Sequence, residues 1–489
     1  MLAVGFLGPS VAEPPLPHRG LGPPYYFSTH ASAWLVMALL FAALSLGSVL
    51  LVVSLRALRA GWRPTVRGIV LMGVIGSLAF LLCPPLGSAD YTNYSAYGHI
   101  ENRGLDAYLI TPLKAAKLGV PTASAVEPPW QKTQSVYGPT SLRIEQVAAW
   151  LGGASLKRTS LWLSILHCLA YLLTGAILLR MATTEAARRR VAALWFANPL
   201  MIYELVAGSH VDALVVLLVV AGLAVFRRSR LMAGLLVGLG VATKVNAAVV
   251  GGAMAWADRK SPKKLCALAL GAALAIGGLY LTASSHALDQ TRRASRFVSA
   301  ATPWWVVVTG LRHLIGRSGS QVLMTMGVAV LAVFLGRAIF RLIPAAADTR
   351  QDAVRSAFGY SLAYLFAAPY LLAWYDSLAW GTIPLLEDGP LDLLLVAHTT
   401  VLAFAALPGR DLPFPTSFKV VVFILHSVVA PMMLLIIIIL TIRRARQITS
   451  PHVQVPDQCG PPVGLDLVAA TPLLESGEHV SALETDGVS

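Results

Sequence analysis

The chain has 489 residues, of which 56% are hydrophobic and 13% are charged. Soluble domains carry about 25% charged residues, so this composition excludes a disordered chain, a coiled coil and an ordinary soluble enzyme. Lys and Arg exceed Asp and Glu by 38 to 24, which gives a net charge of +14. The basic residues form short clusters between long apolar segments, which is typical of loops beside a membrane. The sequence therefore predicts a membrane protein that does not bind nucleic acid.

The N-terminal residues 1–30 contain several prolines and Gly-Pro pairs, which predict an irregular arm. Residues 31–446 hold the apolar segments, and segments of about 17–25 residues can cross a bilayer as helices. The long segments are 31–55, 68–87, 159–181, 264–284, 319–340 and 418–442, and shorter ones lie at 191–207, 211–226, 354–370, 376–388 and 391–407. We expect an all-α polytopic membrane protein with about 13 transmembrane passes.

The segment 231–257 differs from the others because it contains Lys244 and has basic clusters at both ends. A single crossing would place one of these clusters outside the cell, against the usual distribution of basic residues. We therefore expect two short half-helices that meet near Lys244 and return the chain to the same side.

The basic clusters predict the orientation, because cytoplasmic loops carry an excess of Lys and Arg. They lie at 56–67, 188–190, 227–230, 259–264, 337–355 and 443–446. This pattern predicts a plasma-membrane protein with an extracytoplasmic N-terminus and a cytoplasmic C-terminus. Residues 88–158 then form a large first extracytoplasmic loop with interfacial helices. The tail, 447–489, has no Lys or Arg and is predicted to be a disordered acidic cytoplasmic segment.

Asp90 opens a polar and aromatic run at the start of the outer loop. In a helix, Asp90, Tyr94 and Tyr97 share one face at i, i+4 and i+7. A carboxylate in this place can accept a proton from an attacking hydroxyl, and the rings can stack on a sugar. The alternative is a helix cap with an aromatic belt at the membrane interface.

Further along the same loop, Tyr137-Gly138-Pro139 opens an amphipathic stretch, 140–151. This stretch either lies in the headgroup region as a surface helix or covers a groove that opens to the outer leaflet. In the second case Tyr137 is a candidate for contact with a sugar or acceptor.

Three polar residues lie near the ends of apolar segments, where polar groups are costly and usually functional. His210 and Asp212 stand at the outer end of one segment, and Lys244 lies between two half-helices. Asp212 is either functional or an N-cap. Lys244 either reaches the outer headgroups or binds a phosphate beside a helix N-terminus.

Two further groups complete the candidate site. Arg292, Arg293 and Arg296 lie in the outer loop 285–302 and either add to an anion site or form a solvated face. Trp374 and Tyr375 stand at the outer end of a segment, where such residues anchor a helix at the interface or line a sugar pocket.

The motifs occur in a characteristic order. They are Asp90…Tyr94…Tyr97-Gly98, Gly104-Leu105-Asp106-Ala107-Tyr108, Tyr137-Gly138-Pro139, Asn198-Pro199, His210…Asp212, Lys244 and Trp374-Tyr375. Together they resemble the actinobacterial polyprenol-phosphomannose-dependent α-1,6-mannosyltransferases, within the GT-C superfamily of multi-pass glycosyltransferases. The chain departs from the family's pattern at Ala107 and Ala373, where the family often has Pro, and at Val211, where it often has Asn.

This resemblance implies a lipid-phosphate sugar donor, an extracytoplasmic active site and Asp90 as the base. It places His210, Asp212 and Lys244 near the donor, and Trp374 and Tyr375 near the sugar. We expect an inverting transfer, most simply of mannose, from a polyprenyl-phosphate donor to a hydroxyl of a glycolipid or glycan, with no metal or cofactor. The alternatives are another sugar such as arabinofuranose, a secondary transporter or lipid flippase, and a membrane scaffold.

Overall fold

The computed structural model describes residues 1–17, 22–410 and 412–448. Every regular element in these ranges is helical, and one isolated β-bridge joins Ser10 and Glu13. The predicted all-α architecture is therefore confirmed for the described residues. The predicted disordered tail lies outside them, apart from its first two residues, which end the last helix.

The long apolar helices are fewer than the sequence suggested. Five are long and apolar enough to cross a membrane, or up to six if a pair bent by 118° counts as one span. The five are α2 (Ala33–Arg59), α7 (Leu156–Met181), α13 (Pro262–Leu281), α15 (Pro303–Leu342) and the continuous stretch Thr416–Gln447. The expected count of about 13 passes is not confirmed, because many of the shorter apolar segments form helices too short to be spans by themselves.

The remaining helices of the bundle are shorter. They are α3 (Val66–Ala79) with η1 (Phe80–Leu82), α8 (Glu185–Val191), η4 (Ala192–Phe196), α9 (Pro199–Met201), η5 (Ile202–Ala207), α10 (Asp212–Val225), α11 (Arg230–Val241), η6 (Val245–Ala247), α12 (Ala248–Ala257), α14 (Asp289–Ala294), α16 (Thr349–Ala367), η7 (Ala373–Asp376), α17 (Ser377–Trp380), η8 (Ile383–Leu385) and α18 (Pro390–Ala406). The predicted break near Lys244 is present, between α11 and η6. Asn198 caps α9 by accepting hydrogen bonds from the backbone N–H of Leu200 and Met201.

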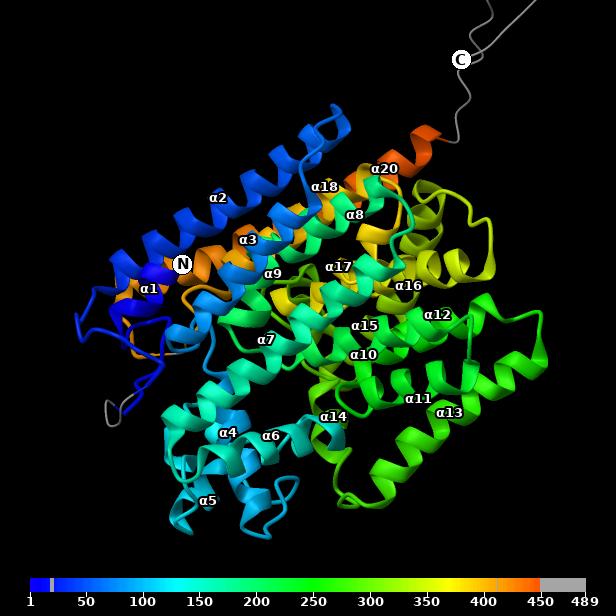
Figure 1. Ribbon diagram of the computed structural model, residues 1–489. Coiled ribbons are helices and arrows are strands. Elements are labelled where there is room, and N and C mark those ends of the chain that lie inside the picture. Colours follow the sequence, from blue (N-terminus) through cyan, green and yellow to red (C-terminus); the bar gives the residue numbers. More distant parts are fainter. Residues whose placement is uncertain (18–21, 411, 449–489) are drawn as a thin grey trace, which may run out of the picture. The chain divides into compact units, whose positions relative to one another are not determined.

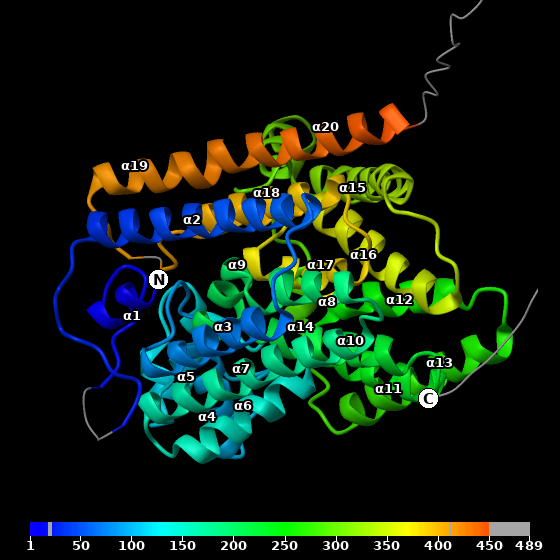
Figure 2. The same ribbon diagram turned by 45° about the horizontal axis from the view of Figure 1, so that its top comes forward.

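Helices from the two ends of the chain pack together. The last stretch consists of α19 (Thr416–Ile424), η9 (Leu425–Val429) and α20 (Ala430–Ile448). The helix α18 contacts both α20 and α2, and the blue α2 lies beside the orange C-terminal helices in both views (Figures 1 and 2). The two ends of the described chain thus close one side of the bundle.

Residues 88–158, which the sequence predicts to be the first extracytoplasmic loop and which are called the outer loop below, carry five short helices and a hydrophobic core of their own. The helices are α4 (Asp90–Asn102), α5 (Pro112–Lys117), η2 (Ala123–Ala125), η3 (Trp130–Lys132) and α6 (Pro139–Gly152). Their core consists of Ala96, Tyr97, Ile100, Ala107, Tyr108, Ala115, Val120, Ala123, Val126 and Leu142, with Ala287 from a later loop. Burial of these side chains stabilises the loop as a folded unit. The helices predicted in this loop are present, and their place at the membrane interface stays a prediction.

The N-terminal arm is not irregular throughout, because it begins with the helix α1 (Leu2–Leu7). Arg410 connects the rest of the arm to the outer loop. It donates to the backbone carbonyl of Glu13 in the arm at 3.0 Å and to the carboxylate of Glu127 in the loop at 3.1 Å. The carboxylate of Glu13 is buried and has no hydrogen-bond partner among the described residues. Burial raises the pKa of Glu13 to about 9, and nearby Arg410 opposes this shift.

Candidate functional site

A cavity of about 450 Å³ brings together several of the predicted residues. Its lining comes from the outer loop, from the break after α11, from the region of α14, from α16 and from the segment around η7. The lining residues include Asp90, Asn93, Tyr97, Trp130, Tyr137, Lys244, Asn246, Thr291, Ser295, Phe297, Tyr364, Tyr370, Trp374 and Tyr375. A cavity of this size, with aromatic walls and a few polar groups, suits a small organic ligand such as a sugar.

Asp90 is the first residue of α4, and its side chain keeps 18% of its surface exposed. The hydroxyl of Tyr94 donates to Asp90 Oδ2 at 3.4 Å, and the hydroxyl of Tyr137 donates to that of Tyr94 at 3.5 Å. The helical face predicted for Asp90 and Tyr94 is present. A carboxylate at the end of this hydroxyl chain is held in one orientation while it still faces the cavity.

Burial raises the pKa of Asp90 to about 6, because the charged form loses its water. Lys244 opposes this shift, and the negative charge of Asp212 adds to it. A carboxylate with a pKa near the operating pH is a stronger base than an ordinary aspartate and is still largely ionised at neutral pH. The environment of Asp90 therefore suits a general base.

Lys244 begins the turn between α11 and α12, and its ammonium forms an ion pair with Asp212. Its Nζ lies 2.8 Å from Asp212 Oδ2 and 3.9 Å from the centre of the Tyr375 ring. Asp212 is the first residue of α10 and is buried behind the cavity wall. The lysine thus points into the cavity with a carboxylate and an aromatic face already around it.

The Tyr-Gly-Pro turn of the outer loop contacts the chain directly before Lys244. The N–H of Gly138 donates to the carbonyl of Thr243 at 3.0 Å, and that of Thr140 donates to Ala242 at 2.9 Å. A Cβ atom on Gly138 would lie 2.1 Å from the carbonyl oxygen of Ala242. Only glycine permits this approach, which joins the outer loop to the break in the bundle.

His210 and Trp374 stack with ring centres 3.7 Å apart and planes inclined by 18°. The Nδ1 of His210 hydrogen-bonds to the backbone carbonyl of Glu204, so Nδ1 carries the proton. Its Nε2 lies 3.9 Å from Asp90 Oδ2 and has no hydrogen-bond partner among the described residues. His210 therefore packs on Trp374, and its Nε2 faces the candidate base.

The three predicted arginines of the loop 285–302 lie apart from the cavity lining. Arg292, Arg293 and Arg296 are exposed, on α14 or just after it. Their neighbours Thr291 and Ser295 line the cavity instead. A short helix presents alternate faces within a few residues, so the cluster in the sequence did not indicate which side chains turn inward. The contribution of these arginines to an anion site remains a prediction.

Asn246 is a site residue that the sequence reasoning missed. It is buried, it lines the cavity, and neither its side-chain nitrogen nor its oxygen has a hydrogen-bond partner among the described residues. Buried amides normally have partners, so this group is available to a ligand. Its place two residues after Lys244, at a helix break, was the signal in the sequence. Tyr364, in α16, was also missed, because it lies inside an unremarkable apolar segment.

A metal site is not formed by the described residues, since no group of three or more His, Cys, Asp or Glu side chains is arranged to hold an ion. The fold and the cavity together define an all-α membrane protein with a polar, aromatic-lined binding cavity beside a structured loop. The comparisons with known proteins narrow this class further.

A family model described as alpha-(1->6)-mannopyranosyltransferase, N-terminal domain, matches residues 2–259, more than half of the chain. The chain therefore belongs to this family, which confirms the resemblance drawn from the motifs. An alpha-(1->6)-mannopyranosyltransferase of Mycobacterium tuberculosis is 35% identical over 153 residues, which cover 30% of this chain and 25% of the relative. Alpha-(1->6)-mannopyranosyltransferase A of Corynebacterium glutamicum is 30% identical over 172 residues, 35% of this chain and 34% of the relative.

A longer alignment joins the chain to alpha-(1->6)-mannopyranosyltransferase B of Corynebacterium glutamicum, at 24% identity over 390 residues, 70% of this chain and 62% of the relative. The chain thus spans between a quarter and about a third of the first two relatives and less than two thirds of the third. No solved structure matches the chain.

Proposed function

We propose that this protein is a membrane glycosyltransferase that transfers mannose from a polyprenyl-phosphate donor to a hydroxyl of a glycolipid or glycan. The active site lies on the extracytoplasmic face, and the transfer inverts the configuration of the anomeric carbon. The observation that carries the proposal is that one cavity is lined by both Asp90 and Lys244, a raised-pKa carboxylate and an ammonium, among aromatic side chains.

The reaction needs a base and a stabilised leaving group. The Asp90 carboxylate takes the proton of the acceptor hydroxyl while the acceptor oxygen attacks the anomeric carbon. The bond between that carbon and the phosphate oxygen breaks, and polyprenyl phosphate leaves with the electron pair. Lys244 faces the developing negative charge on the phosphate and stabilises it.

The other lining groups supply sugar recognition. Tyr97, Tyr137, Trp374 and Tyr375 offer aromatic faces and hydroxyls, and Asn246 offers a free amide. His210 and Asp212 act from behind this wall, one through its stack on Trp374 and the other through its ion pair. The names of the relatives favour mannose among sugars of similar size.

A secondary transporter or flippase is the alternative function. Such proteins place their binding groups near the middle of the bilayer, in repeated halves of the chain. Here much of the cavity lining comes from the predicted extracytoplasmic loop and from the ends of helices. These features support an enzyme that works at the outer face.

The test compares membranes that carry the wild type or Asp90→Asn, incubated with labelled polyprenyl-phosphate mannose. We expect transfer by the wild type and a loss of about 10²–10⁴-fold in the variant, the usual effect of removing a general base. Asp289→Asn is the matched control, because the Asp289 carboxylate of α14 is 41% exposed and lies outside the cavity lining. Transfer by Asp90→Asn at nearly the wild-type rate would exclude Asp90 as the base.

The identity of the sugar is tested separately with the wild type. A polyprenyl-phosphate pentose donor is offered in place of the mannose donor. Transfer of the pentose without transfer of mannose would exclude mannose and leave the glycosyltransferase reaction standing. Movement of intact donor across the membrane without any transfer would instead favour the flippase.

A further inference from the structure

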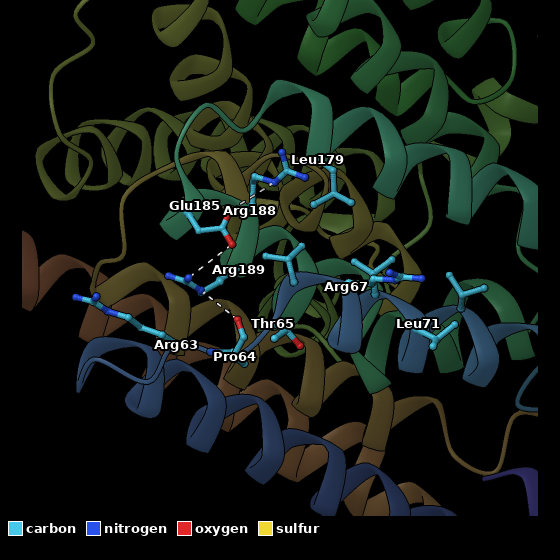
Figure 3. Close-up of a pocket in the computed structure, with 12 residues that line it drawn as sticks. Arg63, Pro64, Thr65, Arg67, Leu71, Leu179, Glu185, Arg188 and Arg189 are labelled. Carbon is cyan, nitrogen blue, oxygen red and sulfur yellow. Dashed lines mark hydrogen bonds and ion pairs between the residues drawn. The ribbon is translucent and has the colours of Figure 1, made fainter.

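A second cavity, of about 680 Å³, lies at the other end of the helices that lead to the Asp90 site. It is formed where α3 begins and where α7 passes into α8, whereas Asp90 follows the C-terminal end of α3 and the outer loop precedes α7. Figure 3 shows its lining side chains, which come from the turn before α3, from α3 itself and from the α7–α8 region. The cavity is therefore distinct from the candidate active site.

Its rim carries an excess of positive charge. Four arginines line it, Arg63, Arg67, Arg188 and Arg189, against one carboxylate, Glu185. Glu185 lies 3.8 Å from Arg188 and 3.6 Å from Arg189 at the closest nitrogen and oxygen atoms. Arg63 and Arg67 are exposed and have no ion-pair partner among the described residues.

The backbone holds the two halves of this basic rim together. The Nε of Arg189 donates to the carbonyl of Pro64 at 3.2 Å, so α8 is tied to the turn that carries Arg63 and leads into α3, where Arg67 lies (Figure 3). Guanidinium groups bind phosphate through paired hydrogen bonds. Two segments thus give the rim a net charge of +3, four arginines less one glutamate.

The wall of the cavity is apolar and runs along the helix axis away from the arginines. Arg67, Val70, Leu71 and Val74 follow one another at i, i+3, i+4 and i+7, which places them on one face of α3. Leu179 of α7 closes the other side. An exposed apolar wall that begins at a basic rim matches a molecule with an anionic head and a hydrocarbon chain.

We infer that this groove binds an anionic phospholipid, with its head group at the basic rim and an acyl chain along the apolar wall of α3. Basic pockets between membrane helices bind anionic head groups in this way. The positive charge of the rim favours an anionic head group. The apolar wall of α3 favours a molecule with a hydrocarbon chain over free phosphate. The inference does not depend on the proposed glycosyl transfer.

The test uses native mass spectrometry of the full chain in detergent, titrated with phosphatidylglycerol or phosphatidylcholine. We expect the wild type to bind phosphatidylglycerol at least about tenfold more tightly, since each basic residue near a lipid surface contributes about 1 kcal/mol. Arg63→Gln combined with Arg67→Gln should lower the phosphatidylglycerol affinity by about tenfold or more. Both side chains are exposed and unpaired, so the unfolding temperature without lipid should stay the same.

The matched control removes the same charge elsewhere. Arg443 and Arg444 are exposed near the end of α20, and their double substitution to Gln should leave the affinity unchanged. Equal binding of both lipids by the wild type would overturn the inference, as would equal losses in the two double variants. Competition by inorganic phosphate at the same concentration as the lipid would identify a soluble anion as the occupant and would also overturn it.

A variant of the apolar wall tests the lipid chain independently of the charge. Leu71 is 56% exposed, so Leu71→Asn should fold normally. We expect it to weaken phosphatidylglycerol binding while Leu281→Asn, at the exposed end of α13, does not. An unchanged affinity of Leu71→Asn for phosphatidylglycerol would show that the acyl chain does not lie in this groove.

Discussion

The ammonium of Lys244 and the carboxylate of Asp212 form an ion pair, 2.8 Å between nitrogen and oxygen, on the wall of the cavity that Asp90 also lines. Charges at such a depth are costly unless they are paired. The ion pair stabilises the charged form of the lysine in the absence of a donor. The exposed part of the ammonium remains accessible to a phosphate. We therefore expect Lys244 to combine a structural role with the proposed functional one, and the two roles can be separated by experiment.

Lys244→Met alone leaves Asp212 as a buried, unpaired carboxylate. We expect it to destabilise the protein by about 3–5 kcal/mol, as the breaking of buried pairs does. Lys244→Met with Asp212→Asn removes both charges and should recover most of the unfolding temperature. Transfer activity should be low in both variants, because both lack the cation for the leaving phosphate. Recovery of activity together with stability in the double variant would show that Lys244 is only structural.

The pKa of Asp90 predicts the pH dependence of transfer. Asp90 acts as a base only when it is ionised, and burial raises its pKa from 3.8 to about 6. We therefore expect kcat/KM to fall as the pH is lowered through about 6, by about tenfold for each further pH unit. The measurement is an initial-rate profile, with the unfolding temperature followed at each pH to exclude denaturation. A constant kcat/KM down to about pH 5 would contradict the raised pKa.

Asn246→Ala tests whether the free amide binds a ligand. No hydrogen bond within the described protein is lost in this variant, so the unfolding temperature should not fall. If the amide binds the sugar or phosphate, KM should rise up to about tenfold, the value of one hydrogen bond. The unfolding temperature and KM together distinguish a ligand-binding amide from a structural one, because the loss of a purely structural amide would lower the stability and leave KM unchanged.

Glu13→Gln should stabilise the protein at alkaline pH. The pKa of Glu13 is raised to about 9 by burial, from 4.5, so between these values the folded chain binds a proton that the unfolded chain has lost. Stability therefore decreases as the pH rises through this range. Gln stays neutral and removes the effect, so the unfolding temperature of the variant should exceed that of the wild type at about pH 8 and match it at about pH 4. Glu185→Gln, an exposed residue, should show no such difference.

The sequence predicted the helical class and the break at Lys244 because both depend on local patterns of polarity. The expected count of about 13 membrane spans is not confirmed, because only five described helices, or up to six, are long and apolar enough to cross a membrane by themselves. Hydropathy detects that 191–207 is apolar, but it does not show that Asn198 and Pro199 divide this segment into short pieces. Whether an apolar helix contacts lipid or is buried inside the bundle depends on tertiary packing.

The candidate site was predicted in part. Asp90, Lys244, Tyr97, Tyr137, Trp374 and Tyr375 line one cavity, although three different regions of the chain supply them. The pairing of Lys244 with Asp212 and the stack of His210 on Trp374 need the folded arrangement. Asn246 was missed because an unpaired amide is recognised only when its surroundings are known. The roles of all these residues in transfer remain predictions.

The contact between Gly138 and the chain before Lys244 has a consequence for how such a cavity changes over evolution. The outer loop carries the proposed base, the bundle carries the cation, and hydrogen bonds from Gly138 and Thr140 to the backbone join the two. Backbone contacts do not depend on which side chains line the cavity. Substitutions in the aromatic wall can therefore alter the preferred sugar or acceptor while the spacing between base and cation, and with it the chemistry, stays the same.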